Sequence, residues 1–249
     1  MIAPQLYLTE NWFTRRLRGL FKGSPQVPEL ARNHGGFSDF DQNRPLAEYD
    51  FVVLDTELTG LNPHRDEIVS VGAVRIRDLR IEPGETFFTM VEPKVPLPKA
   101  STLIHHITPS QVRGRPRLRA VLPRLVEYLN GSLVVGHWVG LDMSFLNRAS
   151  RRILGGSLMN PCLDTMRLAM VYQEELWENN ASRVATRVSY SLVDLCKDWG
   201  LPQFPAHHAL YDAMQTAYLF LYLVKKLRQG GIETLKDLYM AGRGWRWYL

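Results

Sequence analysis

The sequence predicts an α/β domain with a mixed β-sheet flanked by α-helices, and three observations support this prediction. Short apolar runs typical of buried strands begin at Phe51. Further along the chain, such runs alternate with segments whose apolar residues have helical spacing, an order typical of α/β architecture. The 249 residues are 45% hydrophobic, which suffices for a sizeable core and excludes a disordered or fibrous chain.

Strands are expected at short apolar runs bounded by polar or turn-forming residues. The first run ends at Asp55 and precedes the turn-like sequence Thr-Gly-Leu-Asn-Pro at residues 59–63. The expected strands are residues 51–54, 68–76, 85–91 and 133–135. The last of these is closed by Gly136.

Helices are expected where apolar residues recur every three or four positions. The first of these segments has a proline at its start, a position that tolerates it. The expected helices are residues 116–129, 142–152, 165–172, 191–199 and 209–228.

Composition changes near residue 48 and predicts three parts. Residues 1–48 form an arm and linker, with a basic, aromatic stretch at 12–22 and a run rich in Gly, Pro, Asn and Asp at 23–45. Residues 49–230 form the main domain, and residues 231–249 form a C-terminal helix and tail.

The charge balance permits a polyanionic partner without requiring one, since 30 Lys and Arg against 25 Asp and Glu give +5. The two cysteines provide no disulfide framework, which favours a reducing cytoplasm. No run approaches the roughly 18 apolar residues needed to span a bilayer, and the N-terminus has no secretory signal pattern. We therefore expect a cytoplasmic protein without a membrane span.

Four carboxylates occupy positions that stability alone does not explain. Asp55 and Glu57 lie two apart at the end of an apolar strand and therefore point to one face, while Asp142 and Asp212 adjoin apolar helical segments. Clustered carboxylates favour Mg²⁺ or Mn²⁺, and two such ions can assist phosphodiester displacement. His207, five residues before Asp212, is a candidate base. Each piece has an alternative: a solvated strand end for the Asp-x-Glu pair, or a helix cap for Asp142.

Three ordered motifs resemble those of the DEDDh 3′–5′ exonucleases, most closely the proofreading epsilon subunit of bacterial DNA polymerase III and its stand-alone relatives. They are Asp-Thr-Glu-Leu-Thr-Gly at residues 55–60, Gly-His-Trp-Val-Gly-Leu-Asp-Met-Ser-Phe-Leu at 136–146 and His-His-Ala-Leu-Tyr-Asp-Ala at 207–213. The resemblance covers residues 49–228 and implies a ribonuclease H-like fold for this exonuclease domain.

The resemblance also implies roles for single residues. Asp55, Glu57, Asp142 and Asp212 match the ligands of two Mg²⁺ or Mn²⁺ ions. His207 matches the general base, because the spacing of the third motif selects it over His208.

Further positions match the family's substrate contacts. Leu58, Thr59 and Gly60 are expected to receive the terminal nucleotide, with Thr59 near its 3′ hydroxyl. The segment from Ile104 through His106 to Ile107 is expected to pack beside the terminal base, although His106 has a structural role as an alternative. The chain departs from the family at Trp138, where relatives commonly carry Asn; we expect this indole to pack in the core, with stacking on a base as the alternative.

These expectations define three functional hypotheses. The first is a 3′–5′ exodeoxyribonuclease of proofreading or repair that acts on a free 3′ end, preferably of single-stranded DNA, and releases nucleoside 5′-monophosphates. The second is an exoribonuclease acting on short RNA, since contacts to the 2′-hydroxyl cannot be deduced from one sequence. The third is a non-catalytic binding subunit, which the intact set of acids and histidine disfavours.

The tails suggest partners. Residues 12–22 fit either a basic amphipathic helix on nucleic acid or membrane, or a helix packed on the domain. Residues 5–8 faintly resemble sliding-clamp-binding peptides, which leaves a polymerase or sliding-clamp partner open. The aromatic C-terminus at 243–249 fits either base stacking or docked packing.

Overall fold

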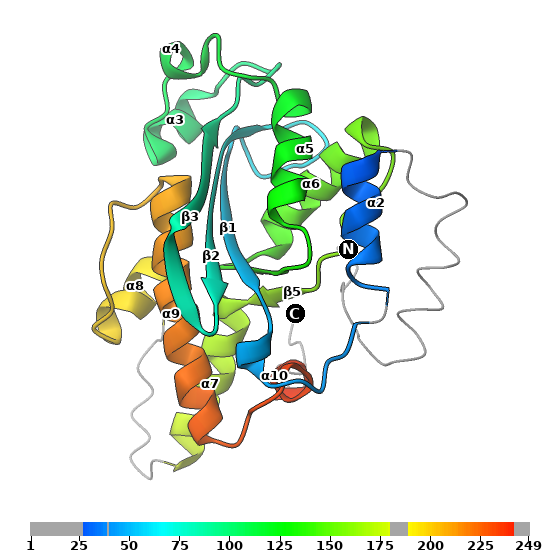
Figure 1. Cartoon of the computed structure of the whole chain (residues 1–249). Coiled ribbons are helices and arrows are strands. Elements are labelled where there is room, and N and C mark those ends of the chain that lie inside the picture. The colour runs from blue at the N-terminus through cyan, green and yellow to red at the C-terminus, as the bar shows by residue number, and fades with distance from the viewer. Residues whose placement is uncertain (1–26, 39, 180–188, 242–249) are drawn as a thin grey trace.

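The computed structural model describes residues 27–38, 40–179 and 189–241, and it contains a five-stranded mixed sheet (Figure 1). The strand order is β3-β2-β1-β4-β5, with β1 in the centre. Strand β1 pairs antiparallel with β2 and parallel with β4, so the sheet is mixed as the sequence predicts. The strands are β1 (Phe51–Leu58), β2 (Ile68–Arg77), β3 (Arg80–Met90), β4 (Leu133–Gly136) and β5 (Cys162–Asp164).

Helices cover both faces of this sheet (Figure 1). One face packs against α2 (Pro28–Gly35), α5 (Leu118–Tyr128) and α6 (Gly140–Ile153). The other packs against α7 (Thr165–Asn179), α8 (Leu192–Asp198), α9 (Ala209–Gln229) and α10 (Leu235–Ala241). The remaining short helices are α3 (Lys99–His105), α4 (Pro109–Val112) and the 3₁₀ turn η1 (Leu46–Glu48).

The central strand contributes to the core on both faces. Phe51 and Val53 pack among the helices α7 to α10, whereas Val52 and Leu54 pack among α2, α5 and α6. This alternation follows from the two-residue period of a β-strand. A strand buried on both faces has a continuous apolar sequence, which explains why residues 51–54 contain no polar position.

Several elements differ from the sequence prediction. Strand β1 runs to Leu58, four residues beyond the predicted end, so Asp55 and Glu57 belong to its C-terminal end, and β3 begins at Arg80 rather than at residue 85. The short elements β5, α3 and α4 were not predicted. Helix α2 lies in the segment that the sequence marks as linker-like, because Leu30 is fully buried and supplies an apolar contact that composition does not reveal.

The segments on either side of the main domain contact it. The backbone of Leu46 bonds to Glu233, and Lys236 bonds to Gln42, which joins the residues before β1 to those before and within α10. Leu235 is buried in the core. The division of the chain at residues 48 and 230 stays a prediction. Residues 5–8, 12–22 and 243–249, for which the sequence suggests partners, lie outside the described residues.

Candidate active site

Asp55 and Glu57 lie near the C-terminal end of β1, and their side chains point to the face of the sheet that α9 covers. They continue the row begun by Phe51 and Val53, which pack against α9 and its neighbours. Only 8% of Glu57 is exposed, and Asp55 is partly buried. The two-residue spacing thus places both carboxylates on one side of the sheet, as the sequence predicts.

Asp212 joins them because the first turn of α9 lies directly on the sheet. Gly72 of β2 is the cross-strand partner of Asp55. A Cβ atom at Gly72 would lie 2.2 Å from the backbone of Ala209, so only glycine permits this approach. Asp212 follows one turn later, and carboxylate oxygens of Asp55, Glu57 and Asp212 lie within 4.8 Å of one another.

Asp142 reaches the end of β1 from the opposite face of the sheet. It lies in the first turn of α6 and is buried. Its Oδ1 accepts hydrogen bonds from the backbone N–H of Thr56, at 3.0 Å, and from the Thr56 hydroxyl, at 2.6 Å. Thr56 therefore holds Asp142 at the end of β1, close enough to Asp55 and Glu57 for their charges to interact, a role for Thr56 that the motif does not predict. The available signal was its place between Asp55 and Glu57, which directs its side chain to the other face.

Burial raises the pKa of every carboxyl group in this cluster, and the charges of neighbouring carboxylates add to the rise at Asp55 and Glu57. Burial, with the charges of Asp142, Asp212 and Glu57, raises the pKa of Asp55 well above its usual range. Burial and the neighbouring aspartates raise the pKa of Glu57 to about 8, and burial raises that of Asp142 to about 7. Burial also raises the pKa of Asp212, with His207 opposing the rise. Gathered oxygen donors that repel one another fit a divalent cation such as Mg²⁺ or Mn²⁺.

The two adjacent histidines before α9 have different surroundings. His207 is exposed and has a left-handed backbone with φ of 63°. The ring of His208 is stacked between Phe88 and Tyr211, with centroid distances of 4.7 and 4.3 Å. The backbone N–H of His208 also donates to Asp212. His208 is thus fixed by packing, whereas the ring of His207 faces solvent beside the carboxylates.

The turn after β1 is closely packed. Thr59 is buried, and its hydroxyl oxygen accepts a hydrogen bond from the backbone of Glu67. A Cβ atom at Gly60 would lie 2.6 Å from the Asp66 carboxylate, which leaves no room for a side chain. Leu58 belongs to the core on the α6 side. A ligand at Leu58, Thr59 and Gly60 therefore meets mainly backbone, whereas the side chain of Leu61 after them is exposed.

The α3 segment has an exposed part and a buried part. Ile104 is 54% exposed, and His106 is exposed with a left-handed backbone that ends α3. Ile107, in contrast, is buried against Val69 of β2 and Val112. The residue after Val69 is the cross-strand partner of Glu57, so Ile107 anchors this segment at the end of the sheet that carries the carboxylates.

Trp138 does not pack in the core, and that expectation from the sequence is wrong. Its side chain is 55% exposed and its φ is 62°, a left-handed conformation that is unusual for a bulky residue. Its backbone N–H donates to the Asp164 carboxylate at 3.0 Å, which stabilises this conformation. Nothing in the sequence around Trp138 signals the bond, because Asp164 belongs to a different strand.

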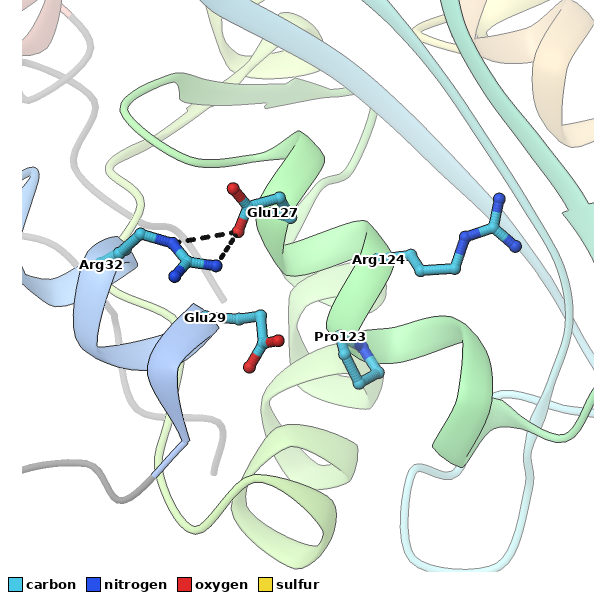
Figure 2. A pocket seen from close by; sticks show the side chains of 5 residues that line it. All are labelled: Glu29, Arg32, Pro123, Arg124 and Glu127. Carbon is cyan, nitrogen blue, oxygen red and sulfur yellow. Dashed lines mark hydrogen bonds and ion pairs between the residues drawn. The ribbon is translucent and has the colours of Figure 1, made fainter.

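A surface hollow elsewhere on the molecule contains none of these carboxylates. Figure 2 shows it between α2 and α5, where an ion pair joins Arg32 to Glu127 at 2.6 Å. Its lining residues are Glu29, Arg32, Pro123, Arg124 and Glu127. These side chains present no donor set comparable with that at the end of β1.

A mixed sheet with helices on both faces, and buried carboxylates gathered at the end of its central strand, defines a nuclease of ribonuclease H-like fold. The Exonuclease family model matches residues 52–220, and the chain belongs to this family.

Named relatives agree with this assignment. The chain is 36% identical over 191 residues to a DNA polymerase III subunit epsilon-like protein of Rhodobacter capsulatus, with 76% of this chain and 26% of that protein covered. It is 31% identical to DNA polymerase III subunit epsilon of Aquifex aeolicus, with 73% and 84% covered. It is also 31% identical to a PolC-type DNA polymerase III of Caldanaerobacter subterraneus, of which it covers only 13%. The chain therefore spans a small part of some relatives and most of another.

Solved structures share the fold. Exonuclease X, solved with 5′ overhanging duplex DNA, is 25% identical, has a TM-score of 0.56, and is covered over 99% of its length by 77% of this chain. Exonuclease I of E. coli, solved with a dT13 oligonucleotide, has a TM-score of 0.62 at 18% identity, with 74% of this chain and 42% of that chain covered.

None of the helices among the described residues combines the length and the apolar character needed to cross a membrane.

Proposed function

We propose that this protein is a metal-dependent 3′–5′ exonuclease that hydrolyses the terminal phosphodiester of DNA and releases nucleoside 5′-monophosphates. The observation that carries the proposal is the group of carboxylate oxygens from Asp55, Glu57 and Asp212 within 4.8 Å, with Asp142 held beside them by Thr56. Such a donor set suits two divalent cations and has no evident structural benefit.

Each residue has a role in this proposal. Asp55, Glu57, Asp142 and Asp212 hold the cations, and a ring nitrogen of His207 removes a proton from the attacking water. Bound Mg²⁺ or Mn²⁺ supplies positive charge for the phosphate oxygens and increases the acidity of water. The exposed position of His207, in contrast to the stacked ring of His208, supports His207 as the base.

The terminal nucleotide is proposed to bind between two segments. Leu58, Thr59 and Gly60 provide the backbone surface after β1, with Thr59 near the 3′ hydroxyl. Ile104 and His106, on the segment anchored by Ile107, flank the terminal base. The exposed side chain of Ile104 supports contact with a base, because stacking a base on it removes apolar surface from water.

The relatives support the choice of substrate and setting. Exonuclease X was solved with a duplex that has a 5′ overhang, and the strand opposite such an overhang ends in a recessed 3′ terminus. Two relatives carry names of DNA polymerase III epsilon type, which supports proofreading or repair and a polymerase or sliding-clamp partner. The cytoplasmic location stays a prediction.

Product analysis tests the proposal. Single-stranded DNA and RNA of the same sequence, labelled at either end, are digested with Mg²⁺, with Mn²⁺ and with EDTA. We expect the 3′ label to leave first as a mononucleotide, the 5′-labelled strand to shorten stepwise, DNA to be cleaved faster than RNA, and EDTA to stop the reaction. Initial release of the 5′ label, cleavage in EDTA, or no cleavage of any strand contradicts the proposal.

A further inference from the structure

The positive charge of this chain is concentrated in one segment. Residues 93–120, here named the basic lobe, contain six Lys and Arg and no Asp or Glu. Since the whole chain carries +5, all the other residues together carry 5 − 6 = −1. The six cations of the basic lobe are Lys94, Lys99, Arg113, Arg115, Arg117 and Arg119.

These cations face solvent, and most of them are uncompensated. All six are exposed. Arg117 pairs with Glu92 at 3.5 Å, whereas no other cation of the lobe forms an ion pair with any described residue. Like charges held together without counter-charges repel one another, which favours a surface that meets an anionic ligand.

The basic lobe adjoins the carboxylates. Val69 of β2 packs against Ile107 and Val112 of the lobe, one residue before Ser70, the partner of Glu57, so the lobe is anchored at the same end of the sheet as the carboxylates. His105 of the lobe lies close enough to His207 for their charges to interact. The backbone of Glu92, at the end of β3, bonds to Pro116. Figure 1 shows α3 and α4 at the end of the sheet where α9 begins, the end that holds Asp212.

The basic lobe can supply the affinity for a long strand that the acid cluster cannot. Two divalent cations would cancel the charges of the four acids at the end of β1, so the loaded cluster offers no excess positive charge to phosphates beyond the terminal one. Affinity for a long strand must therefore come from positive charge outside the cluster. The basic lobe belongs to the longest stretch of the sequence without Asp or Glu, residues 93–126, and lies at the end of the sheet where α9 begins.

We propose that the basic lobe binds backbone phosphates of the substrate strand beyond the terminal nucleotide, so that this exonuclease prefers polymeric nucleic acid to dinucleotide-sized substrates. The inference rests on the proposed function, because it assigns a binding surface to the same site. Phosphate contacts by Lys and Arg supply affinity that is independent of sequence and sensitive to salt.

The test removes three lobe cations and compares two substrates. The variant carries Lys99→Gln, Arg113→Gln and Arg119→Gln, three positions without described ion pairs. The first substrate is a single strand of about 20 nucleotides, longer than most single-strand binding sites. The second is the p-nitrophenyl ester of thymidine 5′-monophosphate, which has a cleavable phosphodiester and no further phosphates.

We expect a loss confined to the long strand. Its KM rises about tenfold or more with kcat retained, and the salt slope of log kcat/KM falls by about 2, at roughly 0.7 for each lost contact to a single strand. Hydrolysis of the p-nitrophenyl ester is unchanged.

A matched control variant loses the same number of positive charges, but far from the carboxylates. The control carries Lys225→Gln, Arg228→Gln and Lys236→Gln, all exposed. Arg228 lies 16 residues after Asp212 on α9, or about 24 Å along the helix. We expect the control to keep the wild-type KM for the long strand and a salt slope close to that of the wild type.

Three outcomes overturn the inference: an unchanged KM and salt slope in the lobe variant, equal losses on both substrates, or equal effects of the lobe and control variants. A lobe variant that loses binding to vesicles of anionic phospholipid, while its binding to DNA is unchanged, assigns the lobe to a membrane surface instead. If the wild type hydrolyses neither substrate, the proposed function fails. The binding of fluorescent single-stranded DNA by wild type and lobe variant, measured by anisotropy, then still decides the inference.

Discussion

Asp55 is a residue whose proposed function conflicts with the stability of the fold. It is surrounded by three other carboxyl groups, and its pKa is raised well above the usual range by burial and by their charges. In the metal-free protein, folding must either keep a proton on this group or bury its charge among other carboxylates, and an uncharged side chain avoids both costs. Replacement by such a side chain also removes an oxygen donor that the proposed cation site requires. Residues at functional sites commonly carry such a cost in stability.

The first prediction is that Asp55→Asn stabilises the metal-free protein and abolishes its activity. The amide keeps the shape of the carboxylate but carries no charge, so we expect a higher Tm in EDTA than for the wild type. We also expect kcat on a 3′-labelled oligonucleotide to fall about 100-fold or more. Thermal unfolding and initial rates measure the two effects.

Asp198→Asn is the matched control, because Asp198 is an exposed acid at the end of α8. It should change neither Tm nor rate appreciably. An Asp55→Asn protein that is as active as the wild type would remove Asp55 from the ligand set. A lower Tm in EDTA would contradict the argument from charge repulsion.

The second prediction concerns Thr56. Thr56→Val removes the hydroxyl bond to Asp142 but keeps the backbone bond, so Asp142 loses part of its orientation. We expect about 1 kcal/mol of lost stability and about a tenfold lower kcat. Thr56→Ser retains the hydroxyl and should restore the rate. If Thr56→Ser is as slow as Thr56→Val, the methyl group rather than the bond is what matters.

At the scale of elements, the contact between β2 and α9 brings Asp212 to the sheet. Gly72 is opposite Asp55, and the backbone of Ala209 occupies the space that a side chain would fill. The helix therefore cannot approach as closely if any other residue replaces Gly72. The position of Asp212 depends on this approach, because it lies in the same first turn.

The third prediction is that Gly72→Ala displaces the start of α9. A methyl group 2.2 Å from backbone atoms requires the helix to move, and overpacking of this kind costs about 1–3 kcal/mol. We expect a lower Tm and a loss of activity larger than the loss of folded protein. Mn²⁺ titration followed by Tm should show weaker binding, since Asp212 is withdrawn from Asp55 and Glu57.

Gly84→Ala provides the control, because no described atom lies within 4 Å of a Cβ atom built at Gly84 of β3. It should leave activity and Mn²⁺ binding intact. If both alanine variants behave alike, the contact at Gly72 does not position Asp212.

The elements also show what the sequence could and could not predict. Residues 51–54 have no polar position, so they are readily recognised as a strand, but Asp55 and Glu57 hide its continuation because charged residues usually end an apolar run. Helix α2 was missed because its stability comes from contacts that are distant in sequence, such as the bond of 2.7 Å from Asn33 to Asn160. The pattern of apolar and polar residues within the segment contains no information on such partners.

In the candidate site, too, some features can be predicted from the sequence and others cannot. The motifs around Asp55, Asp142 and Asp212 identify the acids without any knowledge of the fold. The roles of Thr56 and Gly72 depend on which strand face and which neighbouring backbone they meet, and these follow only from the register of β1 with β2 and from the packing of α6 and α9. The exposed, left-handed Trp138 likewise depends on Asp164, a residue 26 positions away.

At the scale of the whole molecule, the acid cluster makes stability depend on pH and on divalent cations. Burial raises the pKa of Glu57 to about 8 and that of Asp142 to about 7, whereas unfolded carboxyl groups titrate near 4. The folded chain therefore holds protons that the unfolded chain has released in this window, so stability falls as pH rises through it. His105 and His137, whose pKa values burial lowers, are neutral in the upper part of the window and do not oppose this trend.

The last prediction is a fall in Tm between about pH 6.5 and pH 8 in EDTA, of about 3–5 °C per pH unit for each proton that only the folded chain holds. Mg²⁺ or Mn²⁺ binds ionised carboxylates, so the rise in Tm that it causes should be larger at the higher pH. Differential scanning fluorimetry of the wild type and of Glu57→Gln measures both effects. Glu57→Gln should show a shallower fall, because it lacks the group with a pKa of about 8. A metal-induced rise that is equal at both pH values would mean that the cation binds away from these four acids.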